Sequence, residues 1–357
     1  MFDTSSAPLS EHSGYRRSAG SYHLVHPTSG AEVSDAVLAA RAAGLGVRVR
    51  GNACAMNGTN IPLPGELLIP TTALDGYHFA AEGTITVGGG ATVLNVNSLL
   101  NSLGYTLRMH NEGGPAATVG GYLSAGGVGP GAEQYGGFWE QVTEVVLVTG
   151  TGEPITVRPG DELFRWLFGS MGQLGIAVRL TLTIAPREGA TPVYPLGRTG
   201  RIEPRVPDTP KRVWLETYVP AECAAEARMA LRRIGMPYRH LWQPRLATFE
   251  RRIRFVSFTP PLLSAHRGDL ALVGEWGDLP EHPDWQALRG LSREISTWTG
   301  SDHRFRRYAS ADLVFEDFDY RSHYGEATLR DFAALKRRFD PDGILVRGPL
   351  SRALASA

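Results

Sequence analysis

Two glycine-rich stretches carry the residue types and spacing best suited to hold a large ligand. The first spans residues 50–58, with the sequence RGNACAMNG, and the second spans residues 118–129, with the sequence TVGGYLSAGGVG. Both follow apolar segments and contain few bulky side chains, so the backbone can come close to a ligand. Glycine permits positive φ angles and leaves amide N–H groups free to point at one anion. Two such loops from one domain could hold the two ends of a dinucleotide, which favours a cofactor-dependent enzyme.

Several common site motifs are missing, and their absence narrows the function. Gly127 and Gly129 are followed by Ala132 where a Gly-x-Gly-x-x-Gly motif needs its third glycine, so a Rossmann dinucleotide site is not supported. Neither lysine follows a glycine, which excludes a Walker A loop. Ser124 lies one residue too far from a glycine for a nucleophile elbow. No histidine and cysteine spacing typical of a metal site occurs, so we expect no metal. Hydrolases, kinases and zinc enzymes lose support together.

Composition bounds the class of protein. The 357 residues have a formal net charge of zero, an apolar fraction of 42% and two cysteines. This length favours two domains, and the charge gives no general attraction to nucleic acid or to an anionic membrane. No run reaches the roughly 18 apolar residues of a membrane-spanning helix. Two cysteines cannot build a disulfide framework, which favours a reducing cytoplasm. Residues 1–20 lack the apolar core of a secretory signal, and we expect them to be flexible.

The first half of the chain contains the elements that must position the two loops. Residues 21–58 are expected to form a strand–helix–strand unit that leads into the first loop, because an apolar helical stripe lies between two short extended segments. Further strands and a helix lead into the second stretch, which we expect to remain a loop. The elements expected here are strands at 22–25, 47–50, 67–70 and 85–87, and helices at 31–43 and 93–103.

The second half changes character after a proline-rich segment at 187–212, which we interpret as a domain junction. Before it, a hairpin turn at 149–153 joins two strands. Beyond it, two strand–helix passes indicate a second α/β layer. The expected strands are 142–148, 154–157, 176–184, 213–219 and 270–275, and the expected helices are 163–168, 221–234, 284–299 and 329–339.

Four motifs, in this order, resemble the FAD-binding domain of the vanillyl-alcohol oxidase/p-cresol methylhydroxylase superfamily, also called PCMH-type. They are the loop at 50–58, the block at 118–127, the segment VVLVTGTGE at 145–153 and the segment GQLGI at 172–176. The tail FDPDGIL at 339–345 is similar to the closing segment of the family. Within the superfamily, the motifs look most like those of cytokinin dehydrogenases. The resemblance covers roughly residues 21–186 and 323–350.

The resemblance implies an α+β fold in which a two-subdomain PCMH-type FAD-binding domain carries a smaller α/β cap domain. The FAD-binding domain would occupy residues 21–186 and the cap, or substrate domain, residues 187–322, with residues 323–357 returning to the FAD-binding domain. The implied activity is that of an FAD-dependent oxidoreductase, either an oxidase or a dehydrogenase. It would move a hydride from a substrate C–H next to nitrogen or oxygen to flavin N5, with O₂ or another electron acceptor reoxidising the flavin. We expect a small-molecule substrate and a role in bacterial secondary metabolism.

The resemblance also implies which residues contact FAD. The first loop would wrap the pyrophosphate, the second stretch would line the flavin and phosphate groove, and Ile176 would reach the adenine or ribose end through its backbone. The implied FAD-binding residues are Arg50, Gly51, Asn52, Ala53, Cys54, Ala55, Asn57, Gly58, Thr118, Val119, Gly120, Gly121, Ser124, Gly127 and Ile176. Small-residue loops fit this task because two buried phosphates without a nearby lysine need several aligned N–H donors.

Two departures from the family pattern affect the chemistry. Cys54 stands where covalent members of the family carry a flavin-linked histidine, and Ala116 stands where doubly linked members carry a cysteine. We therefore expect noncovalent FAD with Cys54 as a small packing residue, and a Cys54 thioether is the alternative. Cytokinin dehydrogenases place a catalytic aspartate where this chain has Gly113, and Glu112 beside it is the candidate base.

The remaining candidates lie toward the end of the chain. His323 and Tyr324 occupy a region that faces the substrate in the family, and their alternative is to pack on the FAD-binding domain. The segment at 303–308 alternates basic and aromatic residues, which fits either a solvated edge or a pocket for an anionic substrate. Five tryptophans concentrate in the second domain, at 214, 242, 276, 285 and 298, and one or two of them would line an aromatic substrate pocket.

The cap is short for this family, so we expect a pocket that is open or completed by a second subunit in a homodimer. Two other functions stay open at this point. One is an NADPH-dependent flavin reductase-like enzyme. The other is a degenerate flavoprotein with a non-redox role in ligand binding or cyclisation.

Overall fold

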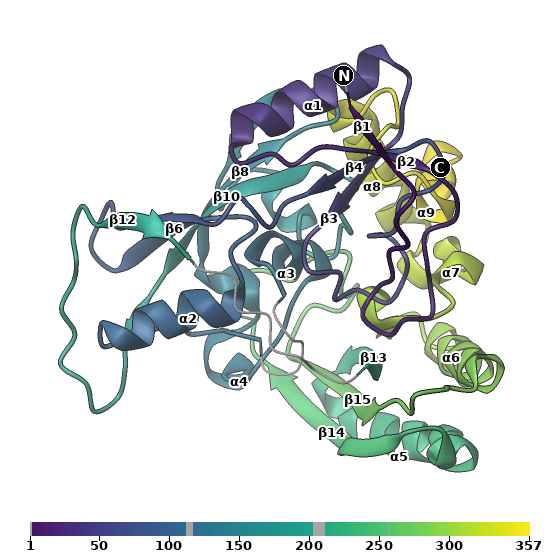
Figure 1. Cartoon of the computed structure of the whole chain (residues 1–357). Helices are drawn as coiled ribbons and strands as arrows, with labels where there is room; N and C mark the ends of the chain where they lie inside the picture. Colours follow the sequence, from purple (N-terminus) through teal and green to yellow (C-terminus); the bar gives the residue numbers. More distant parts are fainter. Residues whose placement is uncertain (1, 112–116, 203–210, 256) are drawn as a thin grey trace.

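The computed structural model describes residues 2–111, 117–202, 211–255 and 257–357 (Figure 1). Helices and strands alternate along these residues, which confirms a mixed α and β protein. The strands of the described residues form a four-stranded N-terminal sheet, a six-stranded sheet, a two-stranded ribbon and a four-stranded cap sheet. The short ribbon pairs β7 (Tyr105–Thr106) with β11 (Ala185–Pro186).

The N-terminal sheet sets the start of the first glycine-rich loop. Its strand order is β1-β2-β4-β3, with β2 and β3 both parallel to β4. Helix α1 (Gly30–Ala42) connects β2 to β3, and its first turn is capped because the Ser29 side chain accepts the amide of Glu32. The strands are β1 (Asp3–Ser5), β2 (Tyr22–Leu24), β3 (Val47–Arg50) and β4 (Leu67–Pro70). The loop therefore begins at the carboxyl end of a parallel strand.

The six-stranded sheet is antiparallel and packs against α1 and the N-terminal sheet. Val33 and Val37 of α1 share one buried cluster with Leu67, Val148 and Val178, which come from the two sheets. The strand order is β12-β5-β6-β10-β8-β9. The strands are β5 (Gly76–His78), β6 (Thr84–Gly88), β8 (Val142–Val148), β9 (Pro154–Val157), β10 (Ile176–Thr183) and β12 (Thr199–Arg201). Because β12 pairs with β5, the segment at 199–201 belongs to this sheet although it lies inside the range expected for the cap.

The second glycine-rich stretch is helical, not a loop. Helix α2 (Val93–Ser102) precedes it, and α3 (Val119–Ala125) is formed by the stretch itself. The Thr118 side chain accepts the amide of Gly121 at 3.2 Å, and Gly126 ends the helix with a φ of 73°. The expectation of a loop was wrong because glycine content outweighed the capping threonine that starts a helix here.

The cap sheet covers α3 from the other side. Its strand order is β14-β15-β13-β16, and its strand pairs are antiparallel. Helices α5 and α6 lie on the outer face of this sheet (Figure 1). The elements are β13 (Arg212–Pro220), α5 (Ala224–Gly235), β14 (Gln243–Ile253), β15 (Leu270–Asp278), α6 (Trp285–Gly300) and β16 (Arg306–Arg307). Strand β14 was not predicted.

The alternation of side chains along β13 separates the two faces of the cap sheet. Val213, Leu215 and Val219 share a buried cluster with Leu288 and Leu291 of α6. The residues between them point to the other face, as the period of two in a strand requires. The inner face of the cap is therefore set by Trp214, Glu216 and Tyr218.

The C-terminal residues return to the N-terminal sheet, where both chain ends lie in Figure 1. Leu345 forms a parallel bridge to Val47. The buried Lys336 ammonium donates hydrogen bonds to the Gln173 and Leu345 carbonyls, both at 2.9 Å, and forms an ion pair with Asp340. The elements are α7 (Tyr320–Tyr324), α8 (Glu326–Phe339) and α9 (Pro349–Ala355), and the remaining short helices are α4 (Ala132–Tyr135) and 3₁₀ turns at Phe138–Gln141, Phe164–Trp166, Ala221–Cys223, Met236–Leu241, Ala309–Ala311 and Phe315–Asp317.

The N-terminal segment, expected to be flexible, is tied to the rest of the molecule. The Arg16 guanidinium donates to the carbonyls of Met56 at 2.6 Å and Leu313 at 2.7 Å. The His12 amide donates to the Ala53 carbonyl at 2.9 Å, and the His12 ring stacks on Trp214 with centroids 5.2 Å apart. These contacts place residues 12–16 against the first loop and the cap. Among the described helices, none has the length and apolar character needed to cross a bilayer.

Candidate functional site

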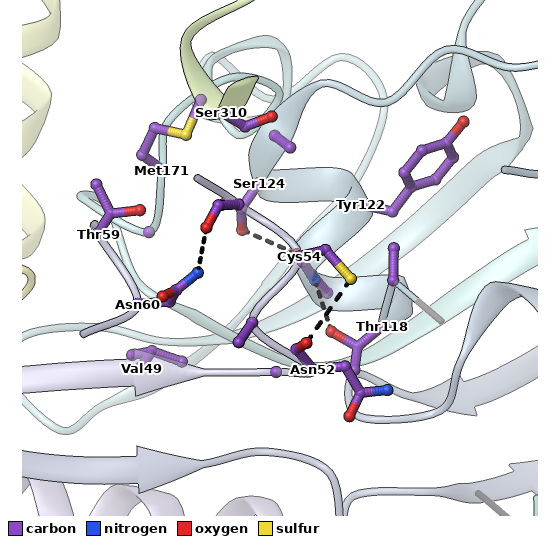
Figure 2. Close-up of a pocket in the computed structure, with 18 of the residues that line it drawn as sticks. Val49, Asn52, Cys54, Thr59, Asn60, Thr118, Tyr122, Ser124, Met171 and Ser310 are labelled. Carbon is purple, nitrogen blue, oxygen red and sulfur yellow. Dashed lines mark hydrogen bonds between the residues drawn. The ribbon is translucent and has the colours of Figure 1, made fainter. Parts of the chain in front are cut away.

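A cavity of about 1300 Å³, measured with the space at its open mouth, lies between the first glycine-rich loop, α3 and the cap sheet. Figure 2 shows side chains of the loop and of α3 turned into the same space. The lining residues come from the segments at 49–60, 71, 111, 117–128, 171–177, 214–216, 272–276, 308–310 and 346.

The first loop presents backbone donors to this cavity. Within the part of the chain that the structure describes, the amides of Gly51, Ala53, Cys54 and Ala55 donate no hydrogen bond to protein, and all of them line the cavity. A Cβ added at Gly51 would lie 2.4 Å from the Thr118 hydroxyl oxygen. The loop can therefore pass this close to α3 only because position 51 has no side chain.

Backbone strain concentrates on the same cavity. Ala53, Met171 and Val346 are the non-glycine residues with positive φ among the described residues, with φ of 56°, 52° and 49°. All of them line the cavity, although they come from separate parts of the sequence. Left-handed backbone costs of order 1–3 kcal/mol at a non-glycine residue and gathers at ligand clamps. The rest of the fold holds these residues in shape, which indicates a site prepared for a ligand.

Helix α3 forms the opposite wall with small residues. Gly120, Gly121 and Ser124 line the cavity together with Thr118, and Ser124 donates its hydroxyl to the Gly120 carbonyl at 2.9 Å. The Gly120 amide donates to the Gly89 carbonyl at 2.8 Å, so it is not available to a ligand. Helix α3 thus offers a surface of small residues that a ligand can approach closely, more than a set of free N–H donors.

The structure brings most of the expected FAD-binding residues to this cavity. Those that line it are Gly51, Asn52, Ala53, Cys54, Ala55, Thr118, Gly120, Gly121, Ser124 and Ile176. Five others lie behind its walls: Arg50, Asn57, Gly58, Val119 and Gly127.

The residues behind the walls support the loop. Arg50 donates to the Ser10 carbonyl at 2.7 Å, and buried Asn57 donates to the Ala309 carbonyl at 3.1 Å. Their side chains bond to the protein instead of facing a ligand, because the loop needs anchors on its far side. A Cβ at Gly127 would meet the Tyr122 ring at 2.1 Å, so this glycine makes room for a side chain.

Cys54 is partly exposed to the cavity and crowded on its other sides. Its thiol donates a weak hydrogen bond to the Asn52 carbonyl at 3.8 Å (Figure 2). Burial raises the pKa of this thiol to about 12, and the nearby Arg50 guanidinium only partly offsets the effect. The sulfur is therefore protonated near neutral pH, which favours the packing role expected for it.

The cap side of the cavity carries aromatic rings around one carboxyl group. Trp214 and Trp276 are direct cross-strand partners of β13 and β15, and Glu216 lies two residues along β13. The Trp276 indole N–H donates to Glu216 Oε1 at 2.5 Å. Gly274 faces Glu216 across the strands, and a Cβ there would lie 2.8 Å from Glu216 Cγ. The carboxyl group thus occupies a gap that a glycine opens in the sheet.

The environment of Glu216 brings the pKa of its carboxyl group close to neutral pH. Burial raises the pKa of this carboxyl to about 7, although the Trp276 hydrogen bond and the charges of Arg251 and Arg307 act in the opposite direction. A group with such a pKa can accept and release a proton near neutral pH. Glu216 therefore has both the position and the protonation behaviour of a general base.

The basic segment at 303–308 is solvated only at its start, where the His303 side chain is exposed and Arg304 is partly exposed. Arg306 and Arg307 are both buried. Arg307 forms an ion pair with Asp312 at 2.8 Å, in which both side chains are fully buried, and it donates to the Glu216 carbonyl at 2.6 Å. Tyr308 lines the cavity, and its amide also donates to the Glu216 carbonyl, at 3.0 Å. The segment fixes the backbone of Glu216.

The expected catalytic pair His323 and Tyr324 is not brought to the cavity. Both side chains are buried, the rings contact each other at a centroid distance of 4.5 Å, and neither lines the cavity. Burial, together with Arg306 and Arg307, lowers the pKa of His323 well below its ordinary value. The pair packs in the core, in line with the alternative role given for it above, packing on the FAD-binding domain. Glu112 lies outside the described residues.

Among the described residues, no group of three or more histidine, cysteine, aspartate or glutamate residues could hold a metal ion.

Some of the cavity residues that were not predicted do have a partial signal in the sequence. The strand at 213–219 was expected, and its period of two already separates Glu216 from the helix-facing residues. Trp214 lies on this strand, and Trp276 directly follows the strand expected at 270–275. That these two residues are cross-strand partners can be seen only in the folded structure. Met171 and Val346 carry no sequence signal, because they reach the cavity through their backbone conformation.

Comparisons with known proteins agree with the position of the two glycine-rich stretches. Residues 22–158 match the sequence family described as FAD binding domain. Over 124 residues, the chain is 31% identical to an alditol oxidase of a Streptomyces species, which covers 35% of this chain and 27% of that protein. Over 173 residues, it is 30% identical to cytokinin dehydrogenase 1 of Arabidopsis thaliana, covering 46% of this chain and 27% of that protein.

A third relative comes from a bacterium. It is the uncharacterized oxidoreductase ORF5 in the fasciation locus of Rhodococcoides fascians, 26% identical over 175 residues, which cover 48% of this chain and 40% of that protein. The match with these relatives spans between about a quarter and two fifths of their length. The resemblance expected from the four motifs is confirmed at the level of the FAD-binding domain.

Proposed function

Because residues 22–158 form an FAD-binding domain and FAD is its cofactor, we propose that the chain is an FAD-dependent oxidoreductase acting on a small organic molecule. The molecule binds in the cavity between the first glycine-rich loop and the inner face of the cap. The observation that carries this proposal is the buried carboxyl group of Glu216, which lines the same cavity as the loop.

The residues of the cavity fit FAD. Amides of Gly51, Ala53, Cys54 and Ala55 without protein acceptors are suited to the pyrophosphate, because several aligned N–H groups can balance its charge where no lysine is near. The glycines of α3 give a surface against which a flat ring can lie. FAD is noncovalent in this proposal, since the Cys54 thiol stays protonated. FAD held here would supply the acceptor for a substrate hydride, with O₂ or another acceptor as the final destination of the electrons.

The chain itself supplies position and proton transfer. A substrate C–H next to nitrogen or oxygen loses its hydrogen as a hydride, and the N–H or O–H proton moves to Glu216 Oε2 or Oε1. The nitrogen or oxygen thereby becomes doubly bonded to that carbon, and the two electrons leave with the hydride. The Trp276 indole holds the carboxyl group in place. Glu112 is the other candidate base. Three expectations from the sequence stay predictions: the domain boundaries, a homodimer and a role in bacterial secondary metabolism.

Absorption and reduction of the purified protein test the proposal. We expect flavin bands in the visible spectrum, release of the colour into the supernatant after acid precipitation, and anaerobic bleaching by an organic donor. Replacement of the carboxyl by Glu216→Gln is expected to slow bleaching more than Glu112→Gln does. Bleaching by NADPH alone would instead support a reductase, and bound FAD that no donor reduces would support a non-redox role.

A further inference from the structure

The cap half of the cavity contains one carboxyl group, that of Glu216, among its described lining residues. Its side-chain hydrogen bond comes from the Trp276 indole N–H, and the charges of Arg251 and Arg307 act on it from the protein side. Arg307 is engaged with Asp312, and Arg251 carries contacts of its own on β14, with its guanidinium over the Phe249 ring. The arginine charges offset the burial of this carboxylate only in part, so a cation placed beside it gains more than it would in water.

The rings around this carboxyl group suit a positive charge. Trp214, Trp276 and Tyr308 line the cavity on the cap side, and Tyr122 lines it from α3. Aromatic faces attract ammonium groups through their negative quadrupole, and this attraction grows when water is excluded. Rings and carboxylate thus favour the same ligand charge.

The rest of the lining discriminates against negative charge. Among the described residues that line the cavity, there is no arginine, lysine or histidine, and Glu216 is the one carboxylate. Leu272 and Val128 add apolar surface next to the rings. An anionic donor would meet this carboxylate with no cationic side chain among the described lining residues, and a polyhydroxylated one would meet few hydrogen-bonding partners on the cap side.

We propose that the cap half of the cavity binds the substrate as an aromatic amine in its ammonium form, with the nitrogen at the Glu216 carboxylate and the ring against Trp214 and Trp276. This assignment rests on the proposed function, since it gives that reaction its substrate class. Glu216 is then a specificity-determining residue before it acts on a proton. The same subsite excludes carboxylic acids of similar shape.

Calorimetric titration of the purified protein, with its bound cofactor, tests this assignment without turnover. The probes are benzylammonium, benzyl alcohol and benzoate, which share a ring and differ in charge. We expect benzylammonium to bind most tightly and benzoate most weakly. Glu216→Gln should weaken benzylammonium binding roughly tenfold to a hundredfold and leave benzyl alcohol within about threefold, because only a charged hydrogen bond is lost.

Two further variants separate charge from structure. Trp276→Leu keeps the carboxylate but removes an aromatic face, and it should weaken benzylammonium binding by about threefold to tenfold. Glu250→Gln, on the neighbouring strand β14, removes a carboxylate that pairs with Arg252 and does not line the cavity, so it should leave the preference unchanged. Equal or tighter binding of benzoate, or a preference that survives Glu216→Gln, would overturn the assignment.

The same samples separate this assignment from the proposed function. Flavin content is read from the visible spectrum of each variant. If benzylammonium is preferred in a protein that holds no flavin, the subsite stands and the oxidoreductase does not. If the flavin is reduced by alcohols while no ammonium preference exists, the oxidoreductase stands and the substrate class is refuted.

Discussion

Replacing Glu216 by glutamine should stabilise the fold by an amount that grows as pH rises from about 4.5 to about 7 and then stays constant. The carboxyl group has a pKa of about 7 in the folded chain, against an ordinary value of 4.5. Since the folded pKa is raised, the folded chain binds the proton more tightly than the unfolded chain does. Stability then falls as pH rises from 4.5 toward 7, and the loss is complete above the folded pKa. Glutamine carries no such penalty.

The size of the effect follows from the two pKa values. Each unit of difference corresponds to about 1.4 kcal/mol, so the charged carboxylate costs roughly 3 kcal/mol of folding free energy at pH 8. The amide oxygen of glutamine can still accept the Trp276 indole N–H, which keeps that contact in the variant. The groups that face Glu216 are Arg251, Arg307 and the phenols of Tyr218 and Tyr308.

Urea denaturation at a series of pH values measures this effect. Wild type and Glu216→Gln are purified in the same way, and the difference in their unfolding free energies is plotted from about pH 5 to about pH 8. We expect the difference to rise by roughly 3 kcal/mol in favour of the variant and then to level off. The control is Glu250→Gln, a partly exposed carboxylate on β14. A flat or falling difference for Glu216→Gln would refute the reasoning.

Three other substitutions test the architecture of the cavity. Gly51→Ala places a Cβ 2.4 Å from the Thr118 hydroxyl and should weaken FAD retention about tenfold, read from the ratio of visible to ultraviolet absorbance, whereas Gly300→Ala fills open space and should not. Arg307→Met leaves the fully buried Asp312 unpaired and should cost about 3–5 kcal/mol in urea denaturation, and the further change Asp312→Leu should recover part of that loss. Arg16→Met frees the carbonyls of Met56 and Leu313 and should lower the thermal midpoint by several degrees, and an unchanged midpoint would show that the N-terminal segment is loosely attached in solution.

The regular elements of this chain could be predicted because their patterns are local. Helix α1 combines an apolar stripe with the capping Ser29, so it could be placed from neighbours in the sequence. Strand β14 was missed because its charged and polar residues do not alternate clearly. Helix α3 was missed because glycines indicate loops when the cap at Thr118 is not weighed.

The candidate site was predictable on one side only. The first glycine-rich loop could be predicted from the sequence, because a backbone that comes close to a ligand requires several small residues in a row. The cap side depends on which strands pair, and the match of Trp214 with Trp276 around Glu216 arises from the register of β13 and β15. His323 and Tyr324 were chosen by analogy with the family, and their packing against Phe318 and Arg306 could not be read from neighbouring residues.

The backbone of Val346 closes one wall of the cavity and is fixed there by a hydrogen bond from the Gln173 amide to its carbonyl at 3.0 Å. During synthesis, this wall does not exist until residue 346 has left the ribosome. A nascent chain that already contains the whole of residues 22–158 therefore presents only a partial groove, and we expect cofactor capture only after residue 346 has been made. Expression of that segment alone should yield a colourless, aggregation-prone fragment, and flavin supplied to cells late in induction should still be incorporated.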